Sequence, residues 1–155
     1  MAITQAMCTS FKQEVMLSMH NFHPTGTSAA STFKLALYSS GATLNASTTG
    51  FVTAGECVGT NYVATGSALT VVGVTSGSTS GFVDFADITF LNVTLTSDGA
   101  LIYNNTPFTS NNAGTTLTNA AVAVLDFGGA KTSTAGDFTI VFPAATSAAA
   151  IIRIA

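Results

Sequence analysis

The first twenty residues and the remainder of the chain follow different hydrophobic periods. Between residues 3 and 19, apolar side chains recur about every four positions, and Lys12, Gln13 and Glu14 fall together on the other side. This spacing predicts an amphipathic α-helix, because residues four apart lie on one helical face. The dipeptide His23-Pro24 ends the predicted helix, since the residue before a proline is disfavoured in the α conformation.

From residue 32 onward the period changes to two, which is the period of β-strands. Phe33, Leu35 and Leu37 alternate with less apolar neighbours and predict a half-buried strand. Runs rich in β-branched and aromatic residues predict further strands at residues 67–74, 82–85, 88–95, 101–103, 121–127, 138–142 and 151–154.

Two glycine-containing dipeptides are expected to separate these strands. Asp98-Gly99 lies between two apolar runs and predicts a tight hairpin turn, because such turns need positive φ at both central residues. Gly128-Gly129 is expected to break the apolar run before it. The ranges 43–66 and 104–118 contain few large apolar residues and are predicted to be loops.

These elements predict an all-β fold with turn signals about every 8–12 residues. We expect an antiparallel β-sandwich, jelly-roll-like or Ig-like, with one N-terminal amphipathic α-helix. The length of 155 residues predicts a single domain over 1–155, with a helix or arm at 1–22 and the sandwich at 32–155. Strand order does not follow from the pattern.

The scarcity of charged residues bears on the class of function as well as on the fold. Charged residues make up 7% of the chain, against about 25% in a typical soluble domain. A folded surface with so few charges favours association, so we expect much of it to meet other subunits. The alternative is a secreted or surface protein with an uncharged, threonine-rich exterior.

Several classes of partner are disfavoured by the same composition. The net charge is -3 and the only four basic residues are scattered, whereas nucleic-acid binding needs clustered lysine and arginine. No apolar run approaches the roughly 20 residues that span a bilayer. The beginning of the chain lacks the pattern of a signal peptide, so we expect synthesis in a cytoplasm and no membrane partner.

Few residues of the chain are candidates for a catalytic or metal-binding role. His20 and His23 form a His-x-x-His pattern without a third ligand nearby, so a metal site is disfavoured and His20 is expected to cap the helix end. Asp84 and Asp87 are expected to be turn or solvent-facing carboxylates rather than a catalytic pair. The two cysteines are expected to be free, semi-buried thiols. We expect no catalytic residues, no metal, no cofactor and no enzymatic activity.

Six segments of the chain carry a resemblance to a known family: residues 3–14, 32–38, 99–104, 122–128, 131–138 and 151–155. Together they resemble small virion proteins encoded by tailed bacteriophages and prophages. The resemblance covers nearly the whole chain apart from 43–66 and 105–118. It implies a non-enzymatic structural component of the virion, made in the host cytoplasm.

Within that family the chain is most similar to capsid cement, or decoration, proteins. The resemblance implies binding to the major capsid protein on the capsid exterior, commonly as a homotrimer. One alternative is a neck or tail component, and a second is a host-surface glycan-binding module. The glycan alternative is weakened because Trp is absent and only three Tyr residues are present.

The predicted helix supplies a candidate for the interface with the particle. Aromatic and methionine side chains are enriched at interface cores. The candidate anchors are Phe11, Met16, Met19 and Phe22. The alternative is that the helix plugs one end of the sandwich.

Overall fold

The computed structural model describes residues 2–23, 30–109 and 116–155. It contains one helix and ten strands in these ranges. The elements are β1 (Ala6–Met7), α1 (Thr9–Met16), β2 (Phe33–Tyr38), β3 (Ser67–Ala68), β4 (Val71–Gly77), β5 (Ser80–Phe85), β6 (Ile88–Asn104), β7 (Phe108–Thr109), β8 (Thr116–Leu117), β9 (Ala120–Ile140) and β10 (Ile152–Ile154).

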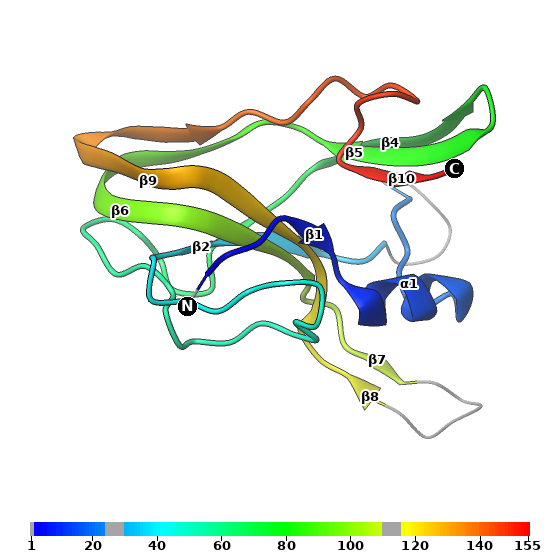
Figure 1. Ribbon diagram of the computed structural model, residues 1–155, viewed down its shortest axis with the longest axis horizontal. Coiled ribbons are helices and arrows are strands. Elements are labelled where there is room, and N and C mark those ends of the chain that lie inside the picture. Colours follow the sequence, from blue (N-terminus) through cyan, green and yellow to red (C-terminus); the bar gives the residue numbers. More distant parts are fainter. Residues whose placement is uncertain (1, 24–29, 110–115) are drawn as a thin grey trace.

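The strands form an antiparallel β-sandwich with a single short helix, as the hydrophobic periods predict. A five-stranded sheet has the order β1-β9-β6-β2-β3, a three-stranded sheet has the order β10-β5-β4, and β7 pairs with β8 alone. In Figure 1, β6 and β9 run side by side and fold back together at one end of the molecule. Their two halves therefore contribute to both layers, and the core lies between them.

The core is a single hydrophobic cluster that draws on both sheets. Phe33 and Leu35 of β2 pack there with Val83 and Phe85 of β5. The expectation that β2 is half-buried is wrong, because Ala36 and Tyr38 on its other side are buried as well. The 43–66 segment covers that side.

Hydrogen bonds fix the covering segment in place. Cys57 N–H donates to the Leu37 carbonyl at 2.8 Å. The Tyr38 hydroxyl donates to the Val52 carbonyl at 2.6 Å. Residues 43–66 are therefore a loop without regular strands, as expected, but one that completes the core.

The predicted hairpin at Asp98-Gly99 is wrong, because both residues lie inside the continuous strand β6. The ladder with β9 shifts register here: Ser97 pairs with Lys131, and Gly99 pairs with Asp126. The intervening residues of β9 include Gly128 and Gly129, whose φ angles are +68° and +123°. Gly128-Gly129 therefore bends β9 without ending it, as a bulge commonly does at a strand corner.

The N-terminal helix is shorter than the period predicts. Residues 9–16 are helical, whereas Ala6 and Met7 pair with Val124 and Ala123 of β9. Ile3 bridges to Leu44. Backbone pairing with the sheet has overridden the four-residue spacing of the first turn and a half. The helix ends before Ser18, whose φ of +58° lies in the left-handed region.

Two further ranges differ from the sequence-based expectation. Residues 67–74, predicted as one strand, divide into β3 and the start of β4. The predicted loop at 104–118 contains the short hairpin β7–β8, and residues 110–115 of that range lie outside the described residues.

Candidate functional site

The four predicted anchor residues do not form one exposed face. Phe11 is 1% exposed and Met19 is also buried, so both belong to the chain's own core. Phe22 is half-buried and stacks on Phe33, with ring centroids 4.3 Å apart. Met16 is 80% exposed. Met16 is therefore the most exposed of the four, while Phe11 and Phe22 line apolar hollows beside the helix.

An apolar groove runs along α1, between the helix and the three-stranded sheet. It consists of two neighbouring hollows of about 340 and 200 Å³, which share Phe11, Val15 and Ile154 as lining residues. Met16 lies at the margin of the first hollow, and Val74 of β4 lines the second. We call this feature the helix groove.

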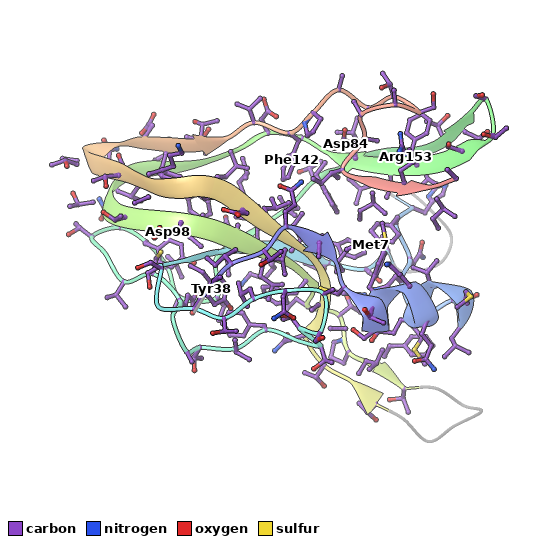
Figure 2. All side chains as sticks on the ribbon, viewed as in Figure 1. Met7, Tyr38, Asp84, Asp98, Phe142 and Arg153 are labelled. Carbon is purple, nitrogen blue, oxygen red and sulfur yellow. The ribbon has the colours of Figure 1, made fainter. Side chains whose placement is uncertain are left out.

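Strand β10 builds the second wall of the helix groove. Ile152 and Ile154 lie on the same face of this strand, but Ile152 is buried in the core whereas Ile154, near the last described residue, is 59% exposed. The guanidinium of Arg153 donates to the carbonyls of Ser147 and Ala148 at 2.9 and 3.0 Å, which ties β10 to the segment before it. Figure 2 shows Met7 at the junction of β1 and α1, and Arg153 on β10 above it. The sequence does not reveal the exposure of Ile154, because strand alternation places it on the same face as the buried Ile152.

A buried polar network holds the chain after α1 against β6. His20 Nε2 lies 2.7 Å from Glu14 Oε2, and the Asn104 amide nitrogen lies 3.0 Å from His20 Nδ1. The Asn104 oxygen accepts from Thr106 N–H, which orients the amide so that its nitrogen donates to His20. Nδ1 is then an acceptor, and Nε2–H donates to Glu14.

The environment favours the neutral form of His20. Burial lowers the pKa of His20 below its ordinary value of 6.5, and the nearby Glu14 carboxylate only partly opposes this effect. The expected helix-capping role for His20 is replaced by this side-chain network. The orphan carbonyls at the helix end accept backbone N–H groups instead, for example Glu14 O from Met19 N. In the described ranges, no three His, Cys, Asp or Glu residues gather as a metal site would require.

Asp84 departs from its predicted position. It is buried on β5, where one carboxylate oxygen accepts from the Phe85 N–H at 2.8 Å, and the other has no hydrogen-bond partner of good geometry among the described residues. Burial raises its pKa. Asp87 is exposed, as expected, and accepts from the Phe142 N–H. Figure 2 shows Asp84 and Phe142 near the segment that joins β9 to β10. Asp84 and Asp87 therefore each accept a hydrogen bond from a different backbone N–H group.

Both cysteines are buried free thiols. Burial raises the pKa of Cys8 and of Cys57 to about 11, so neither is a reactive thiolate near neutral pH. The Cys57 thiol donates to the Thr96 carbonyl at 3.2 Å.

A larger hollow, of about 520 Å³, lies along β9. Phe127, Phe138 and Phe142 contribute to its lining, with Gln5 and Lys131 among its polar members. Its lining offers no pair of acidic or nucleophilic groups. Its chemistry is that of an apolar contact surface, like that of the helix groove.

No family model matches the chain, and no curated protein or solved structure shows significant similarity to it. Among the described residues, no helix has the length and apolar character needed to cross a membrane.

Proposed function

We propose that this chain is a non-enzymatic structural protein of a tailed-bacteriophage virion, and specifically a capsid cement protein that binds the lattice of the major capsid protein. The observation that carries the proposal is the helix groove, an apolar depression on a protein in which only 7% of residues are charged. A surface of this kind suits close packing against another subunit. The resemblance of the sequence to phage virion proteins supports the major capsid protein as that subunit.

Two alternatives share part of this support. A neck or tail component would use the same groove and differ chiefly in its copy number. The glycan-binding alternative needs exposed aromatic platforms, and Tyr38 and Tyr103 are both buried. The Tyr62 hydroxyl is engaged with Glu56 at 3.0 Å. The tyrosines therefore give the glycan alternative no support.

The test is the copy number of the chain in purified virions, measured by quantitative mass spectrometry against the major coat protein. We expect a ratio comparable to that of the coat protein. The Met16→Asp variant should lower incorporation at least about tenfold, because it places a charge at the margin of an apolar contact. Val58→Asp is the matched control, since Val58 is 94% exposed and lies outside the groove.

Each outcome has a distinct meaning. A wild-type ratio of a few per cent would replace cement by a neck or tail role. Absence from virions would overturn the proposal. Equal incorporation of the Met16→Asp and Val58→Asp variants would mean that the helix groove is not the surface that binds the capsid lattice.

A further inference from the structure

Strand β4 is an edge of the three-stranded sheet. It pairs with β5 on one side, in regular register from Gly73↔Asp84 to Gly77↔Ser80. No strand of the described residues pairs with its other side. Figure 1 shows the β4–β5 hairpin extending away from the fold-back of β6 and β9. Within the described part of the chain, its outer backbone groups are therefore not used by a strand partner.

The sequence of β4 lacks the features that normally protect such an edge. Natural monomers discourage pairing at an edge with charged side chains, prolines, bulges or very short strands. β4 has seven residues and contains neither a charge nor a proline. Its one bulge lies near its start, between Val71 and Gly73. The whole range 57–83 contains no charged residue.

The exposed side chains of β4 suit a strand partner. Val72 and Val74 are 57% and 59% exposed, although β-branched residues stabilise a sheet most when they pack against a cross-strand neighbour. Thr75 and Ser76, also exposed, follow them. An additional strand would give both valines such neighbours.

We infer that β4 pairs antiparallel with β4 of a second copy of this chain, across a two-fold axis. A strand related to itself by a two-fold axis forms an antiparallel pair, so the same edge serves both partners. Two identical strands would repel one another if they carried charge, and β4 carries none. A charged partner strand would meet no complementary charge on β4. The pairing joins two three-stranded sheets into one of six strands.

This inference concerns the isolated protein and does not rest on the proposed function. It also specifies a two-fold pair, whereas the resemblance to cement proteins implies a homotrimer. Light scattering distinguishes a dimer from a trimer directly by mass. We expect a mass of twice the 15.6 kDa chain at micromolar concentration. A mass of one chain or of three chains would overturn the inference, whatever the protein does in a virion.

Cysteine scanning tests the contact itself. In antiparallel pairs, opposite Cα atoms lie about 4.5–5.5 Å apart, within the range that a disulfide spans. Among Val72→Cys, Val74→Cys and Ser76→Cys, we expect the variant nearest the axis to form a disulfide-linked dimer fastest under mild oxidation. The native Cys8 and Cys57 do not compete, because both are buried.

The control is Val58→Cys, which places a more exposed thiol away from β4. Equal cross-linking of this variant would mean random collision and would contradict the pairing. A second variant, Thr75→Lys, sets like charges against each other on β4 outside the helix groove and should weaken the dimer at least about tenfold. Val58→Lys should leave it unchanged. Circular dichroism checks that each variant is folded, and a folded Thr75→Lys protein with undiminished dimerisation would overturn the inference.

Discussion

At the scale of single residues, several ionisable groups of this chain take part in its internal hydrogen bonding. Glu14, His20 and Asn104 form one buried network that joins α1 to β6. The His-x-x-His spacing in the sequence does not reveal this role, because the partners of His20 come from six positions before it and from a strand 84 positions later. A buried histidine in such a network makes the stability of the fold depend on pH.

The lowered pKa of His20 predicts how stability changes with pH. Because the folded pKa lies below the unfolded value of 6.5, the neutral ring contributes stability above pH 6.5. That contribution is lost as the pH falls through the folded pKa. At about pH 7, His20→Gln should lower the free energy of unfolding by about 2 kcal/mol, since it disturbs a buried hydrogen-bond network.

The difference between wild type and His20→Gln should shrink as the pH falls from about 7 to about 5, because only the wild type loses the contribution of the neutral ring. Equilibrium denaturation followed by circular dichroism measures it. Val58→Gln, at a position that is 94% exposed, is the control and should change stability by less than about 0.5 kcal/mol. A difference that stays constant over this pH range would argue against a buried neutral His20.

At the scale of elements, the two long strands depend on a shared bend. Around Ser97 and Gly99 in β6, and around Gly128 and Gly129 in β9, the ladder between the two strands shifts register, and a bulge of this kind locally bends its strand. The Gly128 N–H donates to the Asp126 carboxylate at 2.9 Å, which helps to hold the bulge. Asp98-Gly99 and Gly128-Gly129, which the sequence predicts to be a turn and the end of a strand, lie at this register shift instead.

Close packing at the bend makes Gly99 sensitive to substitution. A Cβ at this position would overlap the Leu125 carbonyl oxygen and lie 2.8 Å from the Ile3 side chain. Gly99→Ala should therefore lower the free energy of unfolding by about 2 kcal/mol, as overpacking of a core does. Thermal or urea denaturation measures the change.

Gly81 provides the matched control, because it also lies in a strand but a Cβ added to it would have no neighbouring atom within 4 Å. Gly81→Ala should be nearly neutral, with a change below about 0.5 kcal/mol. Equal effects of the two substitutions would mean that glycine flexibility, and not the close approach at the bend, sets the cost.

At the scale of the whole molecule, the N-terminal segment and the sandwich share one core. Cys8 and Phe11 are buried in the same cluster as Leu35 and Val122. The N-terminal segment is thus packed into the sandwich, and the helix groove beside it, with Met16 among its lining residues, is open at the surface. The low charge of the chain then gives both the groove and the β4 edge an apolar character suited to protein contacts.

The sequence by itself determined the class of fold, the chain position of the helix and most strand segments. These follow from hydrophobic period and residue propensity, which are local properties. The tertiary structure alone decided that β1 replaces the first part of the predicted helix, that two pairs of predicted strands are continuous, and that Phe11 and Met19 face inward. Each of these depends on contacts between residues distant in sequence: Ala6 with Val124, Ser97 with Lys131, and Phe11 with the core. A local pattern does not contain such contacts, because they form only when the sheets pack together.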